Sequence, residues 1–107
     1  MRTYTAILSH YPTDPPTANV LDSTLVGTPA LVRNDVGLFE LVLNGAFPAD
    51  ATVVFVGFAA LAIGDEYDAK AKSTGLNSIA IEVRDAAGNL IDGFEKLSIH
   101  IMVKDPA

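Results

Sequence analysis

The feature that most constrains this chain is an unbroken apolar run, Ala51-Thr52-Val53-Val54-Phe55-Val56-Gly57-Phe58. The run is rich in β-branched and aromatic residues, and the turn-forming segment Asn44–Asp50 precedes it. This pattern favours a strand that is covered on both faces over one that is half exposed. Because successive side chains of a strand point to opposite faces, each side needs its own apolar cover. One side can face the core, whereas the other needs a loop, a helix or a neighbouring subunit.

Length and composition support the same view. A chain of 107 residues supports one hydrophobic core, so we expect a single domain that spans residues 1–107. Apolar residues other than glycine make up 50% of the chain, and the mean hydropathy is +0.33. This is more apolar surface than the interior of a small monomer uses, so we expect the chain to self-associate.

Most of the remaining chain alternates apolar and polar residues, which is the pattern of half-buried strands. The segment Ala59–Lys72, apolar to Ile63 and then charged, is the exception. We expect it to be mostly irregular; the alternatives are a strand that continues to Ile63 before a loop, or a short helix. Leu90 and Ile91 are expected to restart a strand after a turn. Short strands separated by turn signals predict an all-β fold, an antiparallel β-sandwich that is immunoglobulin-like or jelly-roll-like. Besides the apolar run, the predicted strands are Thr3–Ser9, Asn19–Leu25, Ala30–Arg33, Val36–Leu43, Asn77–Arg84 and Leu97–Lys104. For Asn19–Leu25 an extended loop is the alternative.

A proline-rich segment near residues 10–18 interrupts this pattern. Pro12, Pro15 and Pro16 remove backbone donors and favour extended geometry, so the segment cannot continue a ladder. We interpret it as an ordinary connection between strands, with a flexible arm that lies on a partner as the alternative.

The charge pattern excludes several classes of partner. The net charge is −6, and the seven basic residues are scattered along the chain, whereas binding to nucleic acid needs a clustered basic face. The chain has no cysteine, so disulfides and thiolate metal sites play no part. No apolar window reaches the roughly 18 residues of a membrane helix, and the first residues lack the apolar core of a signal peptide. We therefore expect a protein made in a cytoplasm, without nucleic-acid or membrane partners.

The sequence contains no recognisable catalytic pattern. Ser98 or Ser78, His100 and Asp92 supply the residue types of a catalytic triad. These types occur in almost any domain, however, and no nucleophile elbow surrounds either serine. We expect a protein that is not an enzyme, in which His100 is a residue of the strand surface or of an interface.

Two acidic clusters are candidate cation sites, and both are better explained as solvated turns. The segment Asp65–Asp68 groups three carboxylates, but it lacks the glycine-punctuated spacing of a calcium loop. The set Asp85, Asn89 and Asp92 fails the alternate-position ligand pattern of such a loop. We therefore predict no metal and no cofactor.

A sugar-binding platform needs exposed aromatic rings with polar neighbours. Tyr11 and Tyr67 could serve, but they are isolated tyrosines and support such a platform only weakly.

The segment Gly37–Val103 resembles small β-rich virion proteins of tailed bacteriophages. The resemblance lies in the segment NGAFPADATVVFVG, the hairpin NSIAIEVRDAAGNLIDGF and the closing strand LSIHIMV. The hairpin is also similar to hairpins of immunoglobulin-like modules in bacterial surface and phage proteins. The resemblance implies a building block of a virus particle, in a head decoration or a fibre, that acts through repeated interfaces.

We therefore expect a non-enzymatic virion structural protein of a tailed phage, assembled in the host cytoplasm. Its expected partners are copies of itself, with a trimer as the expected form, and other virion proteins such as the major capsid protein. The alternative is an adhesion or carbohydrate-binding immunoglobulin-like module. The residues expected to form the interface are Val54, Val56, Phe58, Leu61, Tyr11 and Pro15.

Overall fold

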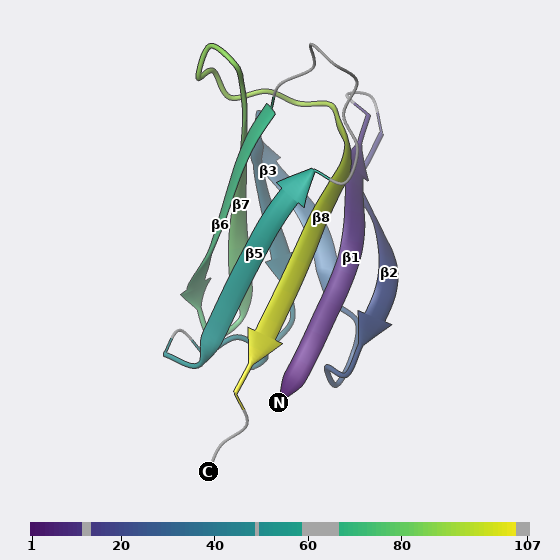
Figure 1. Ribbon diagram of the computed structural model, residues 1–107, viewed down its shortest axis with the longest axis vertical. Helices are drawn as coiled ribbons and strands as arrows, with labels where there is room; N and C mark the ends of the chain where they lie inside the picture. Colours follow the sequence, from purple (N-terminus) through teal and green to yellow (C-terminus); the bar gives the residue numbers. More distant parts are fainter. Residues whose placement is uncertain (12–13, 49, 59–66, 105–107) are drawn as a thin grey trace.

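The computed structural model describes residues 1–11, 14–48, 50–58 and 67–104, with Phe58 and Tyr67 described for their backbone only. The described residues form eight strands in two four-stranded sheets, and every strand pairing is antiparallel. Figure 1 shows the sheets packed face to face as two layers. One sheet has the order β2-β1-β8-β5 and the other the order β3-β4-β7-β6. The strands are β1 (Arg2–His10), β2 (Thr17–Ser23), β3 (Ala30–Asp35), β4 (Leu38–Val42), β5 (Thr52–Phe58), β6 (Tyr67–Gly75), β7 (Ser78–Asp85) and β8 (Phe94–Val103).

The fold confirms the antiparallel β-sandwich predicted from the alternating pattern. Strands β1, β4, β7 and β8 occupy the inner positions of the two sheets, and every second side chain of these strands is buried. Their inward side chains meet between the layers and form one core. The largest fully buried apolar side chains are Tyr4, Leu8, Phe39, Leu41, Phe47, Ile79, Ile81, Phe94, Leu97, Ile99 and Ile101.

The turn between β3 and β4 packs closely against the β7–β8 connection. Its glycine, Gly37, has a φ of +69° and is buried. A Cβ atom at this position would lie 2.7 Å from the carbonyl oxygen of Val83 and 2.9 Å from the backbone nitrogen of Ile91. The carbonyl of Gly37 also accepts a hydrogen bond from the Val83 backbone. Only glycine therefore allows the two segments to approach this closely.

Strand β5 lies at the edge of its sheet with Val53 and Phe55 exposed on one side, so the described residues cover only its other side. Cover of the exposed side by a neighbouring subunit stays a prediction. Two expectations about other elements are wrong. Of the segment expected to be mostly irregular, residues 59–66 lie outside the described residues, and residues 67–72 are not irregular, because they begin strand β6, which pairs with β7. Leu90 makes an isolated bridge with Arg84 and does not restart a strand.

The position of β6 explains why the sequence did not predict this strand. On its inward side β6 presents the small residues Ala69 and Ala71, which pack against the core, and on its outward side it carries Lys70 and Lys72. A sequence of alanines and charges has low strand propensity. The neighbouring strand β7 supplies the hydrogen bonds that local sequence does not predict.

Candidate interaction surface

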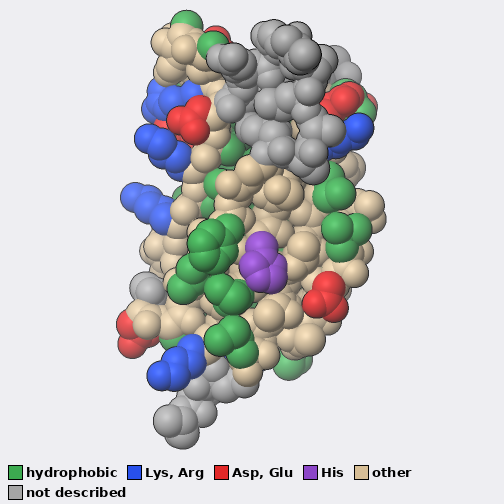
Figure 2. Space-filling view, viewed as in Figure 1, with side chains coloured by type: hydrophobic (Ala, Val, Ile, Leu, Met, Phe, Trp, Pro, Cys, Tyr) green, Lys and Arg blue, Asp and Glu red, His purple; other side chains and the backbone are tan. Residues whose placement is uncertain are grey.

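The candidate surface is the side of the β2-β1-β8-β5 sheet that faces away from the core, here called the outer face. It differs from its surroundings in its exposed hydrophobic side chains. Figure 2 shows hydrophobic side chains gathered on this side of the molecule around a histidine, with charged side chains mainly toward the margins. The outward residues are Thr17, Asn19 and Asp22 from β2, Thr3, Thr5, Ile7 and Ser9 from β1, Ser98, His100 and Met102 from β8, and Val53, Phe55 and Gly57 from β5.

The strand register places these residues in rows across the sheet. Phe55 pairs with His100, which pairs with Thr5, which in turn pairs with Asp22. The next row joins Val53 to Met102 and Thr3 through the same strands. The outer face is therefore apolar along β5 and becomes polar toward β2.

Apolar exposure is concentrated on β5. Val53 is 48% exposed and Phe55 is 56% exposed. Gly57, the next outward position, adds no side chain, and its carbonyl accepts a hydrogen bond from the Ser98 hydroxyl at 2.8 Å. Two large apolar side chains on one uncharged strand form an exposed apolar patch. Such a patch is unfavourable in water unless another surface covers it.

His100 lies in the middle of the outer face and is held there by its neighbour. Its Nδ1 atom lies 2.6 Å from the Thr5 hydroxyl, and both side chains are partly buried. The contact orients the imidazole on the sheet surface beside Phe55. His100 is thus a residue of the strand surface, as the sequence predicted.

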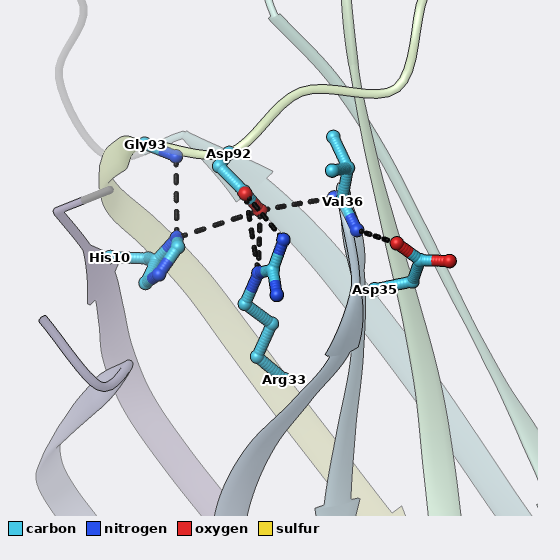
Figure 3. A network of polar contacts seen from close by, with 7 residues as sticks. His10, Arg33, Asp35, Val36, Asp92 and Gly93 are labelled. Carbon is cyan, nitrogen blue, oxygen red and sulfur yellow. Dashed lines mark hydrogen bonds and ion pairs between the residues drawn. The ribbon is translucent and has the colours of Figure 1, made fainter. Parts of the chain in front are cut away.

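A cluster of polar contacts lies at the end of the sandwich where β1 ends and β8 begins (Figure 3). Arg33, near the end of β3, donates three hydrogen bonds to Asp92: from Nε to Oδ1 at 3.0 Å and to Oδ2 at 3.2 Å, and from Nη2 to Oδ2 at 2.7 Å. The backbone N–H of Gly37 donates to Oδ1 of Asp92 at 3.2 Å. The Arg33 guanidinium lowers the pKa of the Asp92 carboxyl; partial burial opposes this shift, and the Gly37 N–H supports it. Asp92 therefore remains ionised and joins three segments of chain.

His10 completes this cluster from the core side. It is 2% exposed, its ring centroid lies 5.1 Å from that of Phe39, and the Phe94 ring is also adjacent. The Gly93 backbone N–H donates to Nδ1 of His10 at 3.3 Å, whereas Oδ1 of Asp92 lies 3.9 Å from the same atom. The imidazole thus acts as an acceptor for the backbone. We interpret the cluster as a structural crosslink.

The residues considered for catalysis are not brought together. Asp92 is bound to Arg33, and the Ser98 hydroxyl is bound to the Gly57 carbonyl. The Ser78 hydroxyl lies on the other sheet, 2.8 Å from the hydroxyl of Thr74. The hydrogen-bond partner of His100 is the Thr5 hydroxyl, and among the described residues neither a serine nor a carboxylate is bonded to it as a triad requires.

The candidate cation sites are explained in part by local hydrogen bonds. The Asp85 carboxylate accepts the backbone N–H groups of Ala87 and Asn89, at 3.0 and 2.9 Å, and so holds the turn after β7. Asp65 and Glu66 lie outside the described residues, and Asp68 is exposed on β6. Within the described ranges, no group of three or more His, Cys, Asp or Glu residues is placed to hold a metal ion.

A cavity of about 710 Å³ borders the other sheet, mainly along β4, β6 and β7. Its lining includes two lysines, Lys70 and Lys72, and two glutamates, Glu40 and Glu82. The charges of these four side chains cancel, so the lining favours neither an anion nor a cation. We assign no ligand to it.

The residues predicted for an interface occupy different parts of the molecule. Val54 and Val56 are half-buried and pack against the core. The exposed apolar side of β5 is therefore formed by Val53 and Phe55, which corrects the side that we expected to be exposed. Tyr11 is 53% exposed, and Pro15 is exposed in the connection between β1 and β2. These two strands are separated from β5 by β8. The Phe58 side chain and all of Leu61 lie outside the described residues.

Sequence reasoning missed the exposure of Val53 and Phe55 and the role of Arg33. One signal was present, because the side of the apolar run that contains Gly57 is the less apolar side. Nothing in the sequence pairs Arg33 with Asp92, which are 59 positions apart.

Comparisons of the chain with protein-family models, with curated proteins and with solved structures gave no match. The described residues include no helix long and apolar enough to span a membrane.

Proposed function

We propose that this chain is a non-enzymatic structural protein that associates with copies of itself through the apolar side of β5. The observation that carries the proposal is the exposure of Val53 (48%) and Phe55 (56%) on a strand without a single charge. Full burial of a valine or phenylalanine side chain contributes roughly 1.5–3 kcal/mol. About half of each side chain is still exposed, so each copy gains on the order of 2 kcal/mol from covering both residues.

The composition of the outer face also supports an interface rather than a catalytic site. Several of its polar members, among them Thr5 and Ser98, are bonded to their own neighbours. A surface whose polar groups are already paired can be covered by a partner without leaving donors or acceptors unpaired.

We further propose that the assembly is the virion of a tailed phage, where the chain serves as a head decoration or a fibre component. This part rests on the resemblance of Gly37–Val103 to small virion proteins. The net charge of −6 suits a protein displayed on the outside of a particle, because like charges keep displayed surfaces soluble. The other expected partner is a virion protein such as the major capsid protein, and assembly takes place in the host cytoplasm.

Light scattering after size-exclusion chromatography tests self-association. At micromolar concentration we expect a mass that is a multiple of 11.3 kDa and that falls on dilution. A mass of one chain at every concentration would contradict the proposal.

The virion assignment has a separate test, namely the identity of the neighbouring genes. We expect capsid or tail genes on either side. If the neighbours encode cell-surface proteins, the adhesion alternative is favoured, and binding to a glycan array then becomes the measurement.

A further inference from the structure

The four strands at the sheet edges differ in how they are protected against pairing with another chain. Strand β2 carries Asp22, β3 carries Arg33, and β6 carries Lys70 and Lys72. The register of each of these three strands with its neighbour also contains an irregularity. Charges and bulges on an edge are the usual means of preventing edge-to-edge association.

Strand β5 has neither form of protection. Its sequence, Thr-Val-Val-Phe-Val-Gly-Phe, contains no charge and no proline, and its register with β8 is regular from Thr52 to Phe58. Short uncharged segments of high β-propensity are the ones that pair with other chains when an edge exposes them. Among the described residues β5 pairs only with β8, although β6 of the other sheet lies beside it.

The backbone groups available at this edge follow from the hydrogen-bond pattern. The backbone N–H of Lys104 donates to the carbonyl of Ala51 at 2.9 Å, and in the register of β5 with β8 these two residues are opposite each other. Antiparallel ladders alternate hydrogen-bonded and non-hydrogen-bonded pairs. Val53, Phe55 and Gly57 therefore direct their backbone groups to β8. Val54 and Val56 direct theirs away from β8, to the edge where no described residue pairs with β5.

We propose that β5 of a second copy pairs antiparallel with β5 at this edge, in the register that centres on Phe55. The proposal rests on the proposed self-association and names its geometry. Phe55 is the midpoint of the strand Thr52–Phe58, so full overlap of the two strands places Phe55 opposite Phe55 of the partner subunit. The same register places Val53 opposite Gly57 of the partner subunit.

This register allows backbone hydrogen bonds between the two strands and also packs their outward side chains against each other. Val54 and Val56 use their free backbone groups in hydrogen-bonded pairs, and Phe55 falls in a non-hydrogen-bonded pair, where side chains lie closest. Aromatic residues opposite each other stabilise a pair of strands. Val53 opposes a residue without a side chain, so each valine has room beside the phenylalanines. The two outer faces become one continuous surface.

The pairing also determines the symmetry of the basic unit. Antiparallel pairing of identical strands relates the copies by a two-fold axis, and such an interface closes with two subunits. The unit is therefore a dimer, in place of the trimer expected from the sequence. Larger assemblies would be built from these dimers through other surfaces.

Disulfide trapping tests the register, because the natural chain contains no cysteine. The variants V53C and G57C are mixed in equal amounts and oxidised, and the products are identified by intact mass. Both variants retain Phe55. A Cβ atom at Gly57 meets nothing closer than the Ser98 hydroxyl at 3.8 Å, so G57C is tolerated. Directly opposed non-hydrogen-bonded residues have Cα atoms about 4.5 Å apart, within the range of about 4.4–6.8 Å that a disulfide spans.

Each variant by itself is the matched control. In the proposed register Val53 lies four residues along the strand from Val53 of the partner subunit, a separation of roughly 13 Å that no disulfide bridges. In the mixture we expect the monomer to be converted into a disulfide-linked V53C–G57C heterodimer. Each variant by itself should remain monomeric on a non-reducing gel. Homodimers and heterodimers in random proportion would overturn the register while leaving self-association in place.

Hydrogen exchange of the wild-type chain distinguishes pairing at the edge from packing of two outer faces. Edge pairing protects the amides of Val54 and Val56, and this protection increases with protein concentration. Association without such protection would overturn edge pairing and leave the proposed function intact. A chain that remains monomeric at every concentration would overturn both.

Discussion

Arg33 and Asp92, 59 positions apart in the sequence, form a bidentate ion pair that joins the end of β3 to the connection between β7 and β8. The Asp92 side chain is 18% exposed, and it also accepts the backbone N–H of Gly37. One carboxylate thus ties β3 and the turn after it to the connection between β7 and β8, at the end of the sandwich where β1 ends and β8 begins.

Replacing this carboxylate should destabilise the fold. We expect Asp92→Asn to lower the free energy of unfolding by about 1–2 kcal/mol, because a charge-assisted pair and a backbone acceptor are weakened together. Urea unfolding followed by circular dichroism gives the value. The control is Asp50→Asn, which changes an exposed carboxylate and should leave the midpoint within error. Equal effects of the two variants would show that the pair contributes nothing specific.

The same pair predicts a dependence of stability on pH. Because the pKa of Asp92 is lowered in the folded state, its contribution is present above the unfolded pKa of about 3.9 and is lost as the pH falls through the lower folded pKa. Unfolding midpoints of the wild type and of Asp92→Asn should differ at pH 7 and converge in acid. A difference that persists at the lowest pH would contradict this assignment.

Gly37 should be far less tolerant of a side chain than another glycine of the same conformation. Gly37→Ala places a methyl group 2.7 Å from the Val83 carbonyl, so we expect a loss of at least about 3 kcal/mol or a chain that does not fold. Gly45 has a similar φ of +73° and nothing within 4 Å of a Cβ position. Gly45→Ala should therefore cost only about 1 kcal/mol, the penalty of the backbone conformation. Thermal unfolding of both variants makes the comparison.

Adjacent residues of β5 should respond in opposite ways to an added charge. Val54 is half-buried and packs against the core, so Val54→Asp should destabilise the monomer by several kcal/mol, because a charge is placed against apolar side chains without a partner. Phe55 is 56% exposed, so Phe55→Asp should leave the monomer folded and abolish association. Circular dichroism reports folding and light scattering reports association. A Phe55→Asp variant that associates like the wild type would exclude β5 from the interface.

The Tyr4 hydroxyl is a buried polar group without a hydrogen-bond partner among the described residues. Burial raises the pKa of its phenol. Tyr4→Phe removes the hydroxyl and keeps the ring in the core, so stability should remain equal or rise by up to about 1 kcal/mol. A loss of more than about 1 kcal/mol in urea unfolding would indicate that the hydroxyl is bonded in solution.

The sequence by itself determined the fold class and most of the strands. Alternation of apolar and polar residues in β1, β7 and β8 is a local property, since one buried face imposes a period of two on each strand. The same reasoning identified the inward side chains of Ile79, Ile81, Ile99 and Ile101, all of which are buried.

Only the tertiary structure decided where each strand lies in its sheet and which side of β5 is covered. The sequence of an apolar run does not show whether the strand lies at the centre or at the edge of a sheet. That position depends on which other strands pair with it and not on the residues of the strand itself. Strand β6 shows the converse, since its alanines and lysines form a strand only because β7 pairs with them. The bond between Arg33 and Asp92 likewise depends on two turns meeting at one end of the sandwich, a proximity that chain packing creates and local sequence does not encode.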